Sequence, residues 1–213
     1  MSNDELFEKI KMKSEKFYKH SHHDKFHVER VYNLALHIAK EENYNVDLDV
    51  IKAAALLHDV ARAMEDEGKI DDHAIESAKI AREILKEVGF PETKIEKVAY
   101  CIMMHRFRNN LKPESLEAQI LQDADRLDML GAIGIARVFS RGGWDNIPIY
   151  DPSIPPKEKY DGKSLTSINH IYEKILKIKN TINTRTGKKI AEERHKFIEQ
   201  YLERFIKEWK GEL

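Results

Sequence analysis

Apolar residues recur at helical spacing along most of the 213-residue chain. They fall three or four positions apart, which places them on one face of a helix. No stretch shows the strict alternation of apolar and polar residues that is typical of a half-buried strand. The stripes are Val28, Val31, Ala35 and Ile38, then Ile75, Ala78, Ala81, Leu85 and Val88, then Ile95, Val98 and Ile102. The pattern therefore predicts an all-α fold.

One segment, from Ile51 to Ala61, is apolar on nearly every side. A helix without a polar face is typical of the centre of a helical domain, where neighbouring helices cover it all round. This segment nevertheless carries His58 and Asp59, whose side chains are costly to bury without strong compensation. A bound metal ion would supply that compensation.

Glycine and proline residues divide the rest of the chain. Lys112-Pro113-Glu114-Ser115 predicts the start of a helix that runs from about 115 to 139. Residues 141–163 combine glycine, proline and aromatic residues, so they are interpreted as one long loop. Loops of this length in compact domains are often lids or binding loops.

Two further helices are expected after the loop, at about 164–183 and 187–209. An apolar stripe in the first of them must be buried, and we expect both helices to pack on the preceding core. The stripe comprises Ile168, Ile171, Ile175 and Ile178. The predicted organisation is a single domain over 1–213, with a metal-binding core at about 20–140 and the loop and C-terminal helices at about 141–213.

Composition argues against several functions. The chain has 36 Lys plus Arg against 37 Asp plus Glu, a net charge of −1, which argues against a stable nucleic-acid partner. The apolar stretches are too short to cross a membrane, and the charged amino terminus is unlike a signal peptide, so a cytoplasmic protein is expected. Cys101 has no partner for an internal disulfide and is interpreted as a core residue.

The basic residues are unevenly distributed. From Lys163 to Leu213, twelve Lys plus Arg face seven Asp plus Glu, an excess of five. Most of these side chains are expected on a solvated helical surface. A few of them, with Lys174 and Lys177 as candidates, would reach a polyanionic ligand.

The candidate functional residues are histidines and aspartates. The sequence contains no GxGxxG, GxxxxGK[ST], HExxH or GxSxG motif. His27 continues the apolar stripe of Val31 and Ile38, and Asp125 stands between Leu121 and Leu127, so both are expected to face inward. With His58 and Asp59 they make two imidazoles and two carboxylates. This donor set suits a divalent ion such as Mn, Ni, Co or Mg, with a transition metal favoured, and leaves positions for water and substrate.

Three short motifs contain these four residues, and together they are more specific evidence than the residues alone. They are DxxHxxRV (Asp24, His27, Arg30, Val31), AALLHDVAR around His58 and Asp59, and QDADRLD around Asp125. Together they resemble the HD-domain metal-dependent phosphohydrolase superfamily. The segments QDADRLDMLGAIGIARVFSRGG, PIYDP and TGKKIAEERHKFI are similar to its YpgQ/YedJ-like branch. The resemblance implies an HD-domain helical bundle and His27, His58, Asp59 and Asp125 as metal ligands.

The resemblance also suggests roles for other residues. In some nucleotidase members an acidic residue follows the HD aspartate by three positions, but here that position is Arg62, which becomes a candidate phosphate contact. Asp128, one turn beyond Asp125, is a candidate base or a support of the ligands. Binuclear relatives carry additional histidines between the HD pair and the last aspartate, and His73 and His105 occupy suitable places in chain order. His105, on an apolar face, is a ligand of a second ion, a support of the ligands or a core histidine. His73, at a helix start, is a ligand or support, a capping residue or a solvent-exposed one. One metal ion is the default expectation.

The expected reaction is hydrolysis of nucleoside triphosphates, deoxy forms included, to a monophosphate and pyrophosphate by metal-activated water. Arg30, Arg62, Lys174 and Lys177 are the candidate substrate contacts, and Asp59, Arg62 and Asp128 the candidate catalytic residues. Two alternatives stay open. One is a monophosphate phosphatase or phosphodiesterase with the same metal site, and the other is a nucleotide-sensing module without turnover. A homodimer is compatible with the sequence.

Overall fold

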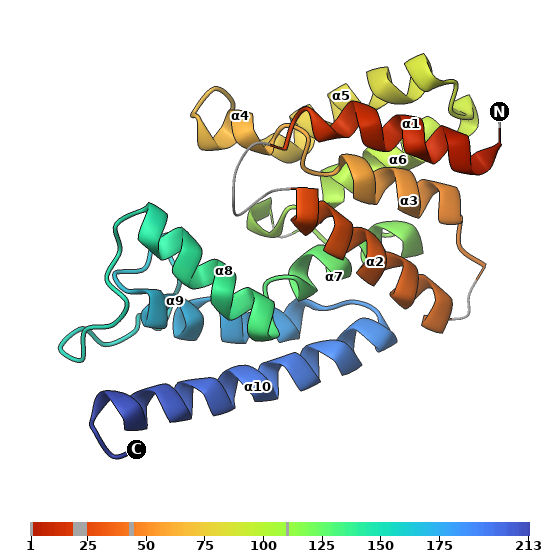
Figure 1. Ribbon diagram of the computed structural model, residues 1–213. Helices are drawn as coiled ribbons and strands as arrows, with labels where there is room; N and C mark the ends of the chain where they lie inside the picture. The colour runs from red at the N-terminus through yellow and green to blue at the C-terminus, as the bar shows by residue number, and fades with distance from the viewer. Residues whose placement is uncertain (1, 19–24, 43–44, 110) are drawn as a thin grey trace. The chain divides into compact units, whose positions relative to one another are not determined.

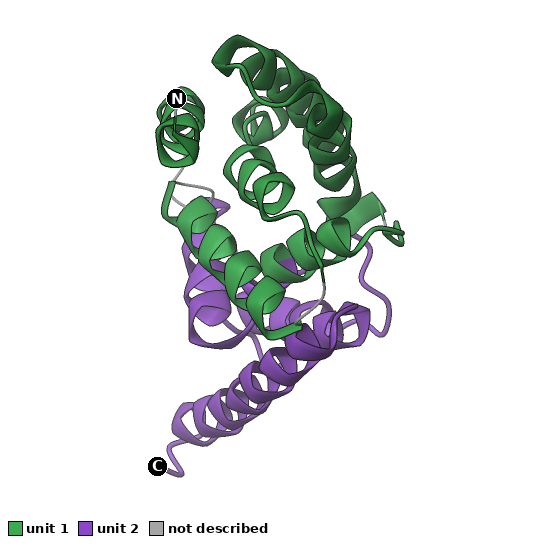
Figure 2. Ribbon diagram, turned by 90° about the vertical axis from the view of Figure 1, so that its right-hand side faces the viewer, with its two compact units in different colours: residues 1–125 green, residues 126–213 purple. Residues whose placement is uncertain are grey.

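The computed structural model describes residues 2–18, 25–42, 45–109 and 111–213, and every regular element among them is a helix (Figure 1). The predicted all-α fold is confirmed. The chain divides into two compact units, residues 1–125 and 126–213 (Figure 2). The single-domain organisation therefore stays a prediction. No helix in the described ranges combines the length and apolarity needed to cross a membrane.

The first unit contains the histidines of interest. Its elements are α1 (Asn3–Glu15), α2 (Lys25–Glu42), α3 (Leu48–Leu57), α4 (Arg62–Asp66), α5 (His73–Val88), α6 (Glu92–His105), the 3₁₀ helix η1 (Phe107–Asn109) and most of α7 (Leu116–Leu127). Helix α3 packs against α1, α2, α5 and α6. Val50, Ile51 and residues 53–57 of this helix are all buried, as the all-round apolar segment predicts.

Helix α3 ends earlier than the sequence predicts. The apolar segment runs to Ala61, but the helix ends at Leu57, and residues 58–61 form a turn before α4. The backbone N–H of Ala61 donates to Ser77 Oγ at 3.0 Å, so it does not continue the helical ladder. His58 and Asp59 therefore lie in a turn at a helix end. Side chains in such a turn are not bound to the 100° spacing of a continuous helix.

The second unit contains the end of α7, α8 (Gly131–Trp144), α9 (Ser167–Glu173), the 3₁₀ helix η2 (Ile175–Thr181) and α10 (Arg185–Trp209). The apolar stripe predicted here is buried, with Ile168, Ile171, Ile175 and Ile178 between 0% and 3% exposed. Within this unit α8 packs against α9 and α10, and η2 packs against α9 and α10.

Three predicted boundaries in this region were wrong. The helix expected at 115–139 is broken between Leu127 and Gly131, because Leu130 is extended and Gly131 has φ of 71°, which interrupts the helical backbone. The irregular segment spans 145–166 and not 141–163, since α8 continues through Gly142. The helix expected at 164–183 is split at Lys174, whose φ of −122° leaves the helical region.

Gly142 lies within α8, although glycine at this position had indicated the start of a loop. A Cβ on this residue would lie 2.3 Å from Ser167 Oγ, so glycine permits close packing of α8 against the start of α9. The sequence presents the same residue as a loop signal. Only the packing distinguishes the two uses.

Candidate metal centre

Six side chains with metal-binding atoms converge in the first unit, and each comes from an element end or a turn. His27 is in the first turn of α2, His58 and Asp59 follow α3, His73 begins α5, His105 ends α6 and Asp125 is in the last turn of α7. Their donor atoms form two groups, His27 with His58 and Asp125, and Asp59 with His73 and His105. The structure thus brings together all four predicted ligands and both additional histidines.

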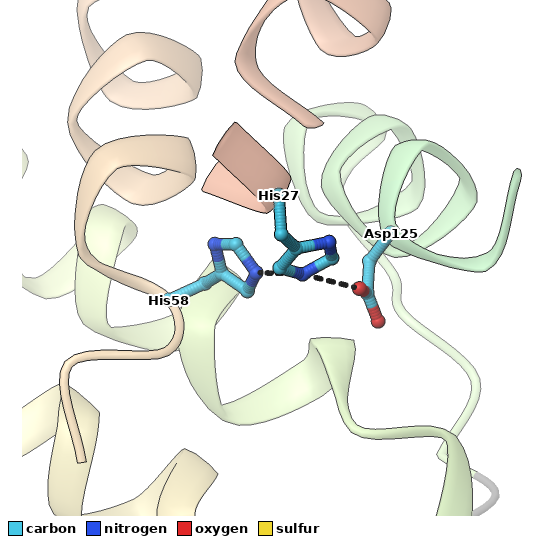
Figure 3. Close-up of side chains that lie close together, drawn as sticks. All are labelled: His27, His58 and Asp125. Carbon is cyan, nitrogen blue, oxygen red and sulfur yellow. Dashed lines mark hydrogen bonds and ion pairs between the residues drawn. The ribbon is translucent and has the colours of Figure 1, made fainter. Parts of the chain in front are cut away.

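The first group is shown in Figure 3, where the ring of His27 lies between His58 and Asp125. His27 Nε2 is 3.4 Å from His58 Nε2 and 3.4 Å from Asp125 Oδ1. Both histidines are fully buried, and the Asp125 side chain is 15% exposed. Two nitrogen atoms and a carboxylate oxygen therefore face a common point.

Asp59 lies between the two groups. Its Oδ2 is 3.6 Å from His27 Nε2 and 3.7 Å from His58 Nε2. Its Oδ1 is 3.2 Å from His73 Nε2 and 3.4 Å from His105 Nε2. One carboxylate thus presents one oxygen to each pair of histidines, which is the arrangement of a bridging ligand.

In two of the histidines, the ring nitrogen that points away from the centre, Nδ1, is hydrogen-bonded to a backbone carbonyl. His58 Nδ1–H donates to Ala55 O at 2.8 Å, and His105 Nδ1–H donates to Ile102 O at 2.5 Å. A carbonyl can only accept, so the proton is assigned to Nδ1 in both rings. The lone pairs of both Nε2 atoms are then available to a cation in the centre.

The electrostatics of the centre also suit a cation. Burial lowers the pKa of His58 to about 4, so this ring is neutral near pH 7. Burial also disfavours charge on His73, but its hydrogen bonds to Asp59 and Glu65 outweigh this and raise its pKa to about 9. For Asp125, burial is outweighed by the hydrogen bond from His27, so its pKa is lowered. Carboxylates that stay ionised in a buried site need a compensating positive charge, which either protonated His73 or a bound cation in its place can supply.

The donor set fits divalent metal ions. His105 carries its proton on Nδ1, and His73 Nε2 lies 3.2 Å from His105 Nε2. Loss of the His73 Nε2 proton, which metal binding requires, would leave the lone pairs of both Nε2 atoms directed at the second group. An ion at each group would accept these lone pairs together with one Asp59 oxygen. Imidazole and carboxylate ligands suit first-row transition metals.

Of the predicted substrate contacts, Arg62 lies near the second group. Its Nη2 donates to Asp66 Oδ1 at 3.0 Å, and its Nη1 is 3.6 Å from Glu65 Oε1. Its Nη1 is also 3.4 Å from His73 Nδ1. Arg30 is half-buried on α2, one turn after His27. Asp24, from the same motif, lies outside the described residues.

The other three predicted residues belong to the second unit. Asp128 is 1% exposed and accepts a hydrogen bond from Arg137 Nη1 at 2.7 Å, an ion pair that favours a structural role. Lys177 Nζ donates to Glu158 O at 2.6 Å, and Lys174 Nζ lies 5.7 Å from the centroid of the Tyr160 ring. Both lysines thus contact the 145–166 segment. Their roles, and the catalytic role of Asp128, stay predictions.

Sequence reasoning missed Glu65 and Arg106, which lie behind the second group. Glu65 accepts hydrogen bonds from His73 Nδ1 at 2.7 Å and from Arg106 Nη2 at 2.7 Å. Burial would raise the pKa of Glu65, but these hydrogen bonds outweigh it and lower the pKa to about 2. Glu65 sits in the acidic run Glu65-Asp66-Glu67, so neither spacing nor composition distinguishes it from a surface residue.

Known proteins are similar to this chain in sequence. The HD domain family profile matches residues 26–130. The uncharacterized protein YpgQ of Bacillus subtilis is 33% identical over 195 residues, which cover 90% of this chain and 86% of YpgQ.

Solved structures are similar in fold as well. An HD-superfamily hydrolase from Bacillus thuringiensis is 36% identical, with a TM-score of 0.78 over 98% of this chain and 99% of that chain. B. subtilis YpgQ, solved in complex with ADP, is 29% identical in the structural comparison, with a TM-score of 0.76 over 98% of this chain and 97% of that one. From its sequence, its fold and these relatives, the chain belongs to the HD-domain family and has the fold of an HD-superfamily hydrolase.

Proposed function

We propose that this protein is a metal-dependent phosphohydrolase that acts on nucleotides. The observation that carries the proposal is the position of Asp59, whose two oxygens face two separate pairs of buried histidines. His27, His58, Asp59 and Asp125 would hold one divalent ion. Asp59, His73 and His105 would hold a second, which extends the single-ion expectation from the sequence.

Divalent ions in such a centre polarise phosphoryl oxygens and lower the pKa of water, so that water becomes a competent nucleophile. The chain's own residues would position the ions and the substrate. The buried histidines would hold the ions in place, and the Arg62 guanidinium, close to the second group, would bind the negatively charged phosphate. Arg30 is a second candidate for this contact because it follows His27 by one helical turn.

Nucleoside triphosphates are the proposed substrates, with cleavage to a monophosphate and pyrophosphate. The relative YpgQ was solved with ADP, which supports a nucleotide ligand here. The excess of five basic residues after Lys163 supports a ligand with several negative charges. Lys174 and Lys177 stay candidates for contacts to the outgoing pyrophosphate.

The proposal is tested by a screen of metals against substrates. Chelated and reconstituted protein is assayed with Mn²⁺, Co²⁺, Ni²⁺ and Mg²⁺ on nucleoside triphosphates, monophosphates and phosphodiesters, with phosphate and pyrophosphate measured separately. We expect pyrophosphate from triphosphates, and loss of turnover in Asp125→Asn.

Other outcomes distinguish the alternatives. Orthophosphate released from monophosphates at equal or higher rates would support a phosphatase, and cleavage of diesters alone would support a phosphodiesterase. Nucleotide binding without turnover under every metal would support a sensing module. Full activity in exhaustively chelated protein would contradict the metal-dependent mechanism itself.

A further inference from the structure

His73 is held differently from the other two histidines whose outer nitrogens have a described partner. His58 and His105 donate from Nδ1 to the carbonyl three residues earlier, Ala55 O and Ile102 O. His73 instead directs Nδ1 to the carboxylate of Glu65, at 2.7 Å. A charged acceptor makes a stronger hydrogen bond than a neutral carbonyl.

The helical position of His73 explains the difference. His58 and His105 stand at the carboxyl ends of α3 and α6, where carbonyls of the preceding turn are available. His73 is the first residue of α5, with Asp72 as its N-cap, so no helical turn precedes it. The positive end of the helix dipole also disfavours a cation there, and a nearby carboxylate offsets that field.

Glu65 is itself fixed by further contacts. It accepts from the backbone N–H of His73 at 2.8 Å, so the same carboxylate holds the ring and the start of α5. Arg106, which directly follows His105, donates to Glu65 Oε1 at 2.7 Å and to Asp72 Oδ2 at 3.1 Å. The guanidinium therefore ties the end of α6 to the start of α5, the two helix ends that carry His105 and His73.

We propose that Glu65 is a positioning residue for the second ion. It orients His73 so that Nε2 points toward Asp59, and its hydrogen bond to Nδ1 makes the imidazole a stronger electron-pair donor to the ion. The inference rests on the proposed function, because it requires an ion at Asp59, His73 and His105. The described hydrogen bonds of Glu65 run to His73 and Arg106, on the side of the second group. The two ions should therefore depend differently on this carboxylate.

The test compares Glu65→Gln with the matched control Glu76→Gln. Glu76 is also an acidic residue near the start of α5, but it pairs with Lys79 on the surface at 2.8 Å. Both variants and the wild type are dialysed against buffered free Mn²⁺, and bound metal is measured by elemental analysis. In Glu65→Gln we expect the second equivalent to bind about 10–100-fold more weakly and the first to be unchanged. Glu76→Gln should match the wild type.

Two further measurements separate positioning from a loss of fold. Absorption spectra of the Co²⁺-loaded protein report the ligand field, and the signal of the first ion should persist in Glu65→Gln. Glu65→Asp, which keeps the charge, should retain more second-ion affinity than Glu65→Gln.

Each failure has its own signature. Two ions bound with unchanged affinities in Glu65→Gln would overturn the role of Glu65 and leave the two-ion centre standing. An equal loss of both ions would also overturn it, since Glu65 would then support the whole fold. A wild type that binds one equivalent, with no change in His73→Ala, would overturn the second ion itself.

Discussion

Among single residues, Asp59 is the one that contacts both groups of the candidate metal centre. It is 3% exposed, and its two oxygens lie within 3.7 Å of four imidazole nitrogens. Each of these histidines belongs to one of the two groups, whereas Asp59 faces both. Its replacement should therefore affect more than one ion.

Asp59→Asn is expected to lose both metal equivalents, because an amide carries no charge and presents only one oxygen. His105→Ala should lose only the second ion and keep about one equivalent, since its Nε2 faces the Asp59 oxygen of the second group. Elemental analysis of the purified variants checks the stoichiometry, and far-UV circular dichroism checks that both remain helical. Two equivalents retained in Asp59→Asn would refute the bridging role.

At the scale of elements, the turn between α7 and α8 is closely held. Arg194 Nη1 donates to Leu127 O at 2.6 Å, and Arg137 Nη1 donates to Asp128 Oδ2 at 2.7 Å. Arg194 Cγ would lie 3.1 Å from a Cβ on Gly131, which is a tight contact, and the φ of 71° favours glycine at this position. These contacts fix the turn that follows the last residues of α7.

Two glycines of α8 offer a matched test of this packing. A Cβ on Gly134 would lie 2.1 Å from Met129 O, whereas a Cβ on Gly143 meets nothing within 4 Å. Gly134→Ala should destabilise the protein by about 1–3 kcal/mol through overpacking. Gly143→Ala should be neutral or stabilising by up to about 1 kcal/mol, because alanine favours the helix. Chemical denaturation of both variants measures the difference, and equal stabilities would contradict the close packing of this turn.

At the scale of the whole molecule, the centre joins segments that are distant in sequence. Its six residues span positions 27 to 125, and they come from five helices or the turns beside them. Ions that bind the folded centre but not the unfolded chain should therefore stabilise the native state.

Metal addition should raise the melting temperature of the chelated protein. Free metal at 100 times the dissociation constant contributes about 2.7 kcal/mol, which corresponds to roughly 5–10 °C for a chain of this length. Differential scanning calorimetry with and without Mn²⁺ measures the shift. Asp59→Asn is the control and should show little change, and an equal shift in this variant would point to metal bound elsewhere.

The sequence by itself determined the helical class and the four principal ligand candidates. Helical spacing of apolar residues is a local property, so it predicts the all-α fold without knowledge of contacts. The order of His27, His58, Asp59 and Asp125 was recognisable because the motifs surround each residue in the chain. The break at Gly131 was missed because it depends on a left-handed backbone conformation that the helical pattern does not reveal.

Only the tertiary structure decided where His73, His105 and Glu65 lie. His73 and His105 are 32 residues apart, and their Nε2 atoms meet because the start of α5 and the end of α6 lie side by side. Glu65 lies in an acidic run, and its contact with His73 follows from the turn that connects α4 to α5. Local pattern determines which face of a helix is buried, whereas the meeting of two helix ends depends on how the helices pack.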